Sequence, residues 1–405
     1  MASITLRPEA RDAILEGSPW VRREEIARLE GAPSLGDAVS VRDHHGDFLG
    51  SGLYAPGARI AVRIMSRDPE ERLDRGAIHR RIARAIELRR ERFGLPDEAE
   101  QSFRLIHGEA DALPGLFVDR FGDVALLRIT CPGIGRYEDD LIGAIARAVP
   151  GGAIYGAPRA SERARADDTP KGLRLLRGEE RDTLSFIEGG ARLEIPLELF
   201  EASGFSLAHR IIRRDLAELA RDRELLEIGA AGSACALSAL QKGARSATAI
   251  EPAPLLAASV RASAERIGVS DRLELLAQRG PSALRSLQSA GRRFDALCLL
   301  PAMPRRSRQT RESASEKASL MQLLRLGLRL LRDEGTLILG GPLGARSEGA
   351  LDELLMHAAR MESRQAIIFE RATAGPDYPS LVGFHEAPVV EALYAIVRRR
   401  RPIHP

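Results

Sequence analysis

The sequence predicts an α/β protein whose N-terminal part is rich in β-strands and whose C-terminal half is a doubly wound, mostly parallel sheet. Before residue 70, short apolar runs with a period of two are separated by turn residues, as in β-strands. From residue 224 on, short apolar runs alternate with helical stretches, as in a parallel sheet with crossover helices. A length of 405 residues suggests two or three domains.

Residues 1–70 are expected to form a small β-rich module. Residues 39–41, 48–54 and 59–65 are the predicted strands. Acids match or exceed arginines across this module, so RNA binding here would depend on shape and a few arginines. Trp20, the only tryptophan, is more often a core residue than a platform for base stacking.

A helix is predicted over residues 72–93, because Ile78, Ile82, Ala85 and Ile86 form one apolar stripe. Arginines occupy the rest of its surface. The plain interpretation is a solvated face, and the sharper one is an RNA-facing stripe between two domains. These arginines are Arg80, Arg81, Arg84, Arg89, Arg90 and Arg92.

The stretch from Leu225 to Glu251 predicts a βαβ unit with a ligand crevice at its carboxyl edge. Gly229 and Gly232 allow a sharp bend and a close approach to a ligand. The helix that begins near Ser233 directs free N–H groups at that ligand. Glu251 ends the second strand, where an acid can accept hydrogen bonds from two ribose hydroxyls.

Glu227 indicates which ligand this turn would hold. A dinucleotide site needs G-x-G-x-x-G for a pyrophosphate, and an acid at Glu227 would repel one, which disfavours an NAD-type oxidoreductase. An acid pairs instead with an ammonium such as that of S-adenosylmethionine (SAM). The pattern resembles the first motif of class I SAM-dependent methyltransferases, with Ala231 and Ser233 in place of two glycines. An ordinary βαβ unit without a ligand is about equally compatible with the motif alone.

Composition narrows the classes of function. The net charge of +3 is too small to indicate nucleic acid by itself, although only three of the 60 basic residues are lysines. The three cysteines form neither a disulfide framework nor a metal-binding spacing, so we expect no metal and a cytoplasmic location. No signal peptide and no apolar run of membrane-spanning length is present, so no membrane partner is expected.

Two phrases resemble a known family. Residues 17–63 resemble a PUA domain, a compact RNA-binding pseudo-barrel. Residues 104–123 closely resemble the central segment of a bacterial family of large-subunit rRNA methyltransferases of the 5-methylcytosine type. The resemblance implies a PUA pseudo-barrel over 1–70, a central α/β linking domain over 71–185, and a Rossmann-like methyltransferase domain over 186–405. It also implies RNA, specifically rRNA, as partner and SAM as cofactor, and leaves room for a homodimer.

The resemblance assigns roles to individual residues. His107, Glu109 and Asp111 would be structural hydrogen-bonding groups at the domain junction. The segment that closes over SAM in the family reads G-Q-K-T-G-F-F-x-D-Q-R, and here Gly204, Phe205 and Arg210 match it. The expected cofactor-binding residues are therefore Glu227, Gly229, Gly232, Glu251, Phe205 and Arg210.

The departures from the family fall on catalytic positions. The Asp-Pro-Pro phrase is replaced by Leu300–Ala302, and residues 340–345 contain no cysteine. Arg279 stands where an acid would hold the adenine amino group, and Ile396 where a lysine is expected. Asp377–Pro379 still resembles the family's D-H-P. Catalytic residues therefore stay unknown, and 5-methylcytosine chemistry is expected to be lost.

Two interpretations of the chain stay open. One is an active SAM-dependent RNA methyltransferase with altered chemistry; the other is an inactive RNA-binding or ribosome-associated pseudoenzyme. Cys298 in its apolar strand and Cys235 on the helix after the turn are expected to be packing residues. The cluster Arg305, Arg306, Arg308 and Arg311 would either hold RNA phosphates or form a solvated loop.

Overall fold

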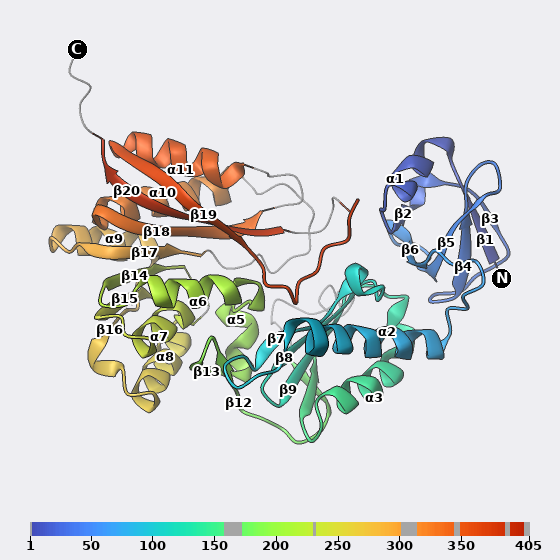
Figure 1. Cartoon of the computed structure of the whole chain (residues 1–405), viewed down its shortest axis with the longest axis horizontal. Helices are drawn as coiled ribbons and strands as arrows, with labels where there is room; N and C mark the ends of the chain where they lie inside the picture. The colour runs from blue at the N-terminus through green and yellow to red at the C-terminus, as the bar shows by residue number, and fades with distance from the viewer. Residues whose placement is uncertain are drawn as a thin grey trace, which may run out of the picture. The chain divides into compact units, whose positions relative to one another are not determined.

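The structure is a computed structural model that describes residues 2–157, 172–229, 232–300, 314–343, 349–384 and 389–400. The chain divides into two compact units (Figure 1). The first comprises Met1–Asp97, Gln101–Arg181 and Pro376–Ala387, and the second comprises Glu98–Glu100, Asp182–Gly375 and Pro388–Pro405. The three-domain boundaries at residues 70 and 185 stay a prediction.

The first unit begins with a six-stranded sheet in the order β2-β6-β5-β4-β1-β3. Its strands are β1 (Ala2–Leu6), β2 (Trp20–Arg22), β3 (Ile26–Glu30), β4 (Ala38–Arg42), β5 (Phe48–Tyr54) and β6 (Ile60–Ser66). The predicted strands at 39–41, 48–54 and 59–65 are thus confirmed. Ile4, Val39, Val41 and Val62 are fully buried and form the centre of the core, together with Ile14 of helix α1 (Arg11–Leu15).

A second sheet of the first unit has the order β11-β10-β9-β8-β7. Its strands are β7 (Ser102–His107), β8 (Leu116–Phe121), β9 (Val124–Ile129), β10 (Ala153–Gly156) and β11 (Arg174–Arg177). Helices α2 (Arg75–Glu87) and α3 (Glu138–Ala148) pack together beside it (Figure 1). The carboxylate of Asp74 caps α2 by accepting the Ala77 N–H at 2.9 Å. The predicted helix and its buried stripe are confirmed, with a π-helical turn at Leu88–Arg92.

The arginine face of this helix is not wholly solvated, which corrects the sequence-based expectation. Arg89 is fully buried, and its guanidinium donates to the two carboxylate oxygens of Asp111 at 2.7 and 2.9 Å. It also donates to the carbonyls of Arg104 and Asp377, both at 3.0 Å. A bidentate ion pair with filled hydrogen-bond sites explains how a charge is tolerated there. Arg89 lies four residues after Ala85 and seven after Ile82, so it continues the buried stripe of the helix rather than its solvent-facing side.

A segment near the C-terminus completes the first unit. The Asp377 carboxylate accepts the Arg104 N–H at 2.7 Å, and the Tyr378 ring stacks on the Arg104 guanidinium at 4.3 Å. The Trp20 ring meets the Phe384 ring edge-on at 4.8 Å and donates from Nε1 to Glu109 at 2.8 Å. Trp20 therefore has a packing role, and Glu109 and Asp111 are structural hydrogen-bonding groups, as predicted.

The second unit is built on a seven-stranded sheet in the order β16-β15-β14-β17-β18-β20-β19. The strands from β16 to β18 pair in parallel, and β20 and β19 pair antiparallel, so the predicted mostly parallel sheet is confirmed. Their bounds are β14 (Glu224–Ile228), β15 (Ser246–Ile250), β16 (Leu273–Leu276), β17 (Phe294–Leu299), β18 (Leu331–Leu343), β19 (Arg364–Thr373) and β20 (Val389–Arg399).

Helices cover both faces of this sheet (Figure 1). They are α5 (Phe200–Ser203), α6 (Arg210–Leu219), α7 (Ala234–Gln241), α8 (Pro254–Arg266), α9 (Gly280–Ser289), α10 (Ala314–Leu330) and α11 (Ala350–Met361). A hairpin of β12 (Thr183–Glu188) and β13 (Ala191–Pro196) precedes them. Among the described residues, no helix is long and apolar enough to cross a membrane.

The buried ion pair of Arg89 leads to a stability prediction. Replacing Arg89 with Leu leaves the Asp111 carboxylate buried without its cation, which should lower the free energy of unfolding by about 3–5 kcal/mol. Urea unfolding followed by the fluorescence of Trp20 reports on this unit, which contains the only tryptophan. The matched change Arg84→Leu on the exposed face of α2 should cost less than about 0.5 kcal/mol. Equal midpoints for the two variants would contradict this account.

Candidate functional site

The candidate site lies where the order of the sheet reverses. The chain leaves β14 toward β15 on one side and returns through β17 on the other, and open α/β sheets bind their ligands at such a reversal, at the carboxyl ends of the strands. Glu227 of β14 is the register partner of Cys298 of β17. An acidic residue and a cysteine are thus paired in the sheet, one residue before β14 ends.

The turn after β14 has the backbone that its sequence predicts. Gly229 has a φ of 97° and Gly232 a φ of 59°, values that residues with a Cβ rarely adopt. Ser233 also has a positive φ of 53°, directly before α7 begins at Ala234. A left-handed conformation at a residue other than glycine costs about 1 kcal/mol and is typical of functional turns. Ala230 and Ala231 lie outside the described residues.

Glu227 is a buried carboxylate beneath this turn. Glu227 is 4% exposed, and its Oε2 atom accepts the N–H of Ala236 at 2.9 Å. The nearby backbone N–H and thiol of Cys235 act to lower the pKa of Glu227. Burial raises the pKa of Glu227 to about 7, despite these donors, and the nearby carboxylate of Glu251 adds to the rise.

Glu251 is the second acid of the site, directly after β15. It is 5% exposed, and its Oε1 accepts the N–H of Ala253 at 3.0 Å. Burial also raises the pKa of Glu251. One of its oxygens is thus fixed by the backbone, which holds the carboxylate in place at the edge of the sheet.

Neither acid has a positively charged neighbour within ion-pair distance in the part of the chain that the structure describes. Two carboxylates near each other and out of water are unfavourable unless a cation or hydrogen-bond donors reach them. A ligand with an ammonium group and hydroxyls would supply both. The arrangement therefore favours a cationic, hydroxyl-bearing ligand over a pyrophosphate.

Phe205 and Arg210 lie in a buried polar network. Arg210 pairs with Glu100, with Nη1 and Oε2 3.0 Å apart, and Arg213 donates to Glu188 at 2.9 Å. The Phe205 ring lies 4.2 Å from the Arg213 guanidinium carbon. These contacts hold the start of α6 to the hairpin of β12 and β13. The predicted role of Phe205 and Arg210 in cofactor binding stays a prediction.

Sequence reasoning missed the acids of this network. Burial raises the pKa of Glu100 to about 7, although Arg210 opposes the rise. Burial, and then the charge of Arg213, lowers the pKa of His209 to about 3. Glu100 precedes α6 by more than a hundred residues, so no local spacing signals that the two meet.

The thiols are buried, as predicted, but their contact was not foreseen. Cys235 and Cys298 are 1% and 0% exposed, and their Sγ atoms lie 3.9 Å apart. Among the described residues, no group of three or more His, Cys, Asp or Glu side chains is arranged to hold a metal ion. The contact follows from the pairing of β14 with β17, which the sequence does not specify.

Several predicted positions are outside the described residues or away from the turn. Pro301, Ala302 and the cluster Arg305, Arg306, Arg308 and Arg311 lie outside the described part of the chain. Arg279 is exposed at the start of α9. Ile396 pairs with Thr336 in the sheet.

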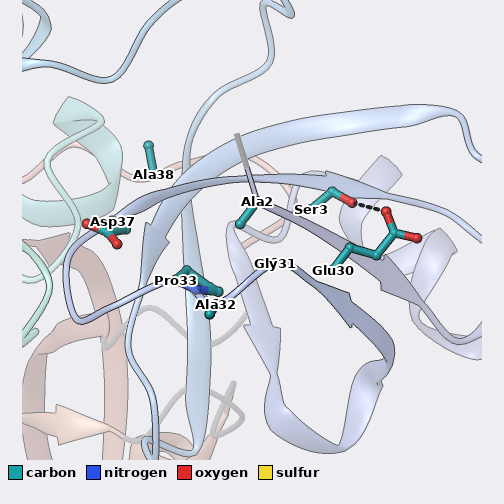
Figure 2. A pocket seen from close by; sticks show the side chains of 8 residues that line it. All are labelled: Ala2, Ser3, Glu30, Gly31, Ala32, Pro33, Asp37 and Ala38. Atoms are coloured by element: carbon teal, nitrogen blue, oxygen red, sulfur yellow. Dashed lines mark hydrogen bonds between the residues drawn. The ribbon is translucent and has the colours of Figure 1, made fainter.

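A cavity of about 620 Å³ lies in the first unit, beside β1, β3 and β4 (Figure 2). Glu30 and Asp37 are its charged lining residues, and the Ser3 hydroxyl donates to Glu30 at 3.2 Å. Carboxylates repel phosphates, so this hollow does not suit an RNA backbone. It is therefore not a candidate for the predicted RNA contact.

The burial of Glu227 predicts a pH dependence of stability. Its folded pKa of about 7 lies above the ordinary 4.5, so the folded state binds more protons and stability falls as the pH rises between these values. The loss is about 3 kcal/mol for a fully buried group. Glu227→Gln keeps the acceptor for Ala236 and should therefore raise the melting temperature at pH 8 but not at pH 4.5.

Glu265→Gln, on the exposed surface of α8, is the matched control and should leave the pH profile unchanged. Calorimetry of the protein without ligands measures both variants. A Glu227→Gln profile that runs parallel to that of the wild type would refute the assignment, because Glu100 would then account for the whole dependence.

Comparison with known proteins agrees with this geometry. Residues 4–67 match a PUA-like domain. Ribosomal RNA large subunit methyltransferase I of Pseudoalteromonas translucida is 25% identical over 386 residues, covering 94% of this chain and 95% of that protein. The protein of the same name from Alteromonas mediterranea is 26% identical over 405 residues, covering 97% and 98%.

Solved structures show the same fold. A candidate SAM-dependent methyltransferase from Streptococcus mutans has a TM-score of 0.80 at 15% identity and covers 98% of this chain and 100% of its own. A candidate methyltransferase with the same values was solved in complex with SAH. The chain thus has a methyltransferase-like α/β fold with an N-terminal PUA-like region, and its predicted resemblance to large-subunit rRNA methyltransferases is confirmed.

Proposed function

We propose that this protein binds SAM at the carboxyl end of β14 and methylates RNA, specifically rRNA. The transfer uses no cysteine nucleophile. The observation that carries the proposal is the buried pair Glu227 and Glu251, which lacks a cation among the described residues. The names of the relatives support rRNA methylation, since those proteins are called large-subunit rRNA methyltransferases. The fold shared with a methyltransferase solved in complex with SAH supports SAM as the cofactor. The PUA-like match over residues 4–67 supports RNA as the partner.

Each residue of the turn has a role in this proposal. Glu227 accepts the ammonium of the methionine part, and Glu251 accepts the ribose hydroxyls with the oxygen that Ala253 does not occupy. Gly229 and Gly232 keep the backbone clear of the ligand. SAM supplies an electrophilic methyl group, and the chain supplies its orientation.

The thiols exclude one kind of transfer. Attack on a cytosine ring needs an accessible thiolate. All three cysteines of the chain are buried, and Cys131 at 2% is the most exposed of them. An acceptor that is itself nucleophilic, such as a base nitrogen or a ribose hydroxyl, needs no covalent adduct. We therefore propose such an acceptor in place of pyrimidine C5.

A second candidate is an RNA-binding protein without methyl transfer. The replacement of the Asp-Pro-Pro phrase by Leu300–Ala302 favours it, because no acid remains at that position of the sequence. This candidate predicts RNA binding that weakens as salt is added and that persists when Glu227 and Glu251 are both replaced. A cytoplasmic location suits either candidate, since free cysteines are typical of a reducing compartment. A homodimer stays a prediction.

Cofactor binding tests the proposal directly. Titration calorimetry should detect SAM binding to the wild type, and Glu251→Gln should weaken it about 10- to 100-fold, since a hydrogen bond to a charged group contributes about 1.5–3 kcal/mol. Glu265→Gln should bind like the wild type. No heat at millimolar SAM, with a folded protein, would reject the proposal and leave the RNA-binding candidate.

The acceptor is tested with labelled SAM and rRNA. Transfer should persist in Cys131→Ser, and RNA that contains 5-fluorocytidine should form no covalent adduct with the protein, because no thiolate attacks the ring. Nuclease digestion and mass spectrometry identify the methylated atom. Recovery of 5-methylcytosine, or of a trapped adduct, would overturn the assignment of the acceptor without affecting that of the cofactor.

A further inference from the structure

Two of the three cysteines meet directly beneath the candidate site. Cys235 is in the first turn of α7 and Cys298 is in β17, and both are reduced. Their Sγ atoms are 3.9 Å apart, with the Cys298 thiol donating to the sulfur of Cys235. Cys131 belongs to the other unit, so this contact is the one thiol pair in the described part of the chain.

The pair is joined to the acid that would hold the cofactor. Cys298 is the register partner of Glu227, and Cys235 directly precedes Ala236, whose N–H donates to the Glu227 carboxylate at 2.9 Å. Any change at the two sulfurs therefore acts on the position and charge of Glu227.

We propose that Cys235 and Cys298 are a modification site, in which a hydroperoxide oxidises the two thiols to a disulfide that weakens cofactor binding at Glu227. The weakening of binding rests on the proposed function, whereas the formation of the disulfide does not. Both cysteines are buried, so only a small neutral molecule can reach their sulfurs when the structure opens locally. For this reason the oxidant is a hydroperoxide.

The reaction balances with the peroxide as the sole co-reactant. One sulfur attacks a peroxide oxygen, the O–O bond breaks, and a sulfenic acid and an alcohol or water form. The second sulfur then displaces the sulfenic oxygen as water, and the S–S bond forms. The two sulfurs together lose two electrons, which reduce the peroxide, and the two thiol protons end in the released water and alcohol.

The disulfide would alter the site in two ways. A disulfide holds its sulfurs about 2.0 Å apart, so the first turn of α7 must move toward β17 from the present 3.9 Å. The same movement shifts the adjacent Ala236, whose N–H donates to the Glu227 carboxylate. The buried carboxylate then changes its hydrogen bond and its position relative to the ligand. Bound SAM should in turn slow the oxidation, because it stabilises the closed state in which both thiols are buried.

The experiment treats the full chain with hydrogen peroxide, with and without SAM. Intact mass should fall by about 2 Da, and non-reducing peptide mapping should link Cys235 to Cys298. SAM affinity by calorimetry should fall about tenfold and return with dithiothreitol, as expected for one lost hydrogen bond. Cys131→Ser should behave like the wild type, and Cys298→Ser should form no link and keep its affinity after peroxide.

The outcomes separate the two proposals. SAM binding without any Cys235–Cys298 link overturns the modification site and leaves the proposed function intact. A link in a protein that binds no SAM when reduced supports the modification site and rejects the cofactor. A link that leaves the affinity unchanged overturns the coupling to Glu227. Cys298→Ser removes only the partner sulfur and should leave the fold unchanged. Circular dichroism and a second variant, Cys298→Ala, check that the fold is kept.

Discussion

The structure depends on a buried carboxylate that has no cation beside it in the described part of the chain. Glu227 lies near the end of a central strand, accepts the N–H of Ala236, and still has a pKa raised to about 7 by burial. A chain selected for stability alone would be expected to replace such a group with an apolar or amide side chain. The proposed cofactor would explain its presence, because the ammonium of SAM supplies positive charge. Under that proposal, Glu227 lowers the stability of the protein without ligand and raises its affinity for the cofactor.

The rest of the second unit holds this acid in place. The order of the strands reverses between β14 and β17, and the positive φ angles of Gly229, Gly232 and Ser233 turn the chain from β14 into the N-terminus of α7. The Arg210–Glu100 and Arg213–Glu188 pairs fix the start of α6 to the hairpin of β12 and β13. The first unit has its own buried ion pair, Arg89 with Asp111, and does not depend on the site.

The sequence predicted what local pattern determines. The strands, the helix over residues 72–93 and the glycine turn follow from periodicity and from the need for positive φ. It did not predict the burial of Arg89, because the partner Asp111 that makes a buried arginine tolerable is distant in sequence. It also did not predict the contact of Cys235 with Cys298, because strand pairing brings the two together. Asp377 is likewise distant in sequence from Arg104, whose N–H it accepts. Contacts of this kind arise from tertiary pairing and carry no local signal.

Proton release on SAM binding at pH 7 tests the central claim most directly. Calorimetric titrations in buffers of different ionisation enthalpy give the number of protons exchanged. With a pKa of about 7, Glu227 is about half protonated in the empty protein and becomes fully ionised when it meets the ammonium. The wild type should therefore release about half a proton more than Glu227→Gln. An equal proton count in the two proteins, with SAM bound to both, would show that Glu227 does not face the positive charge of the cofactor.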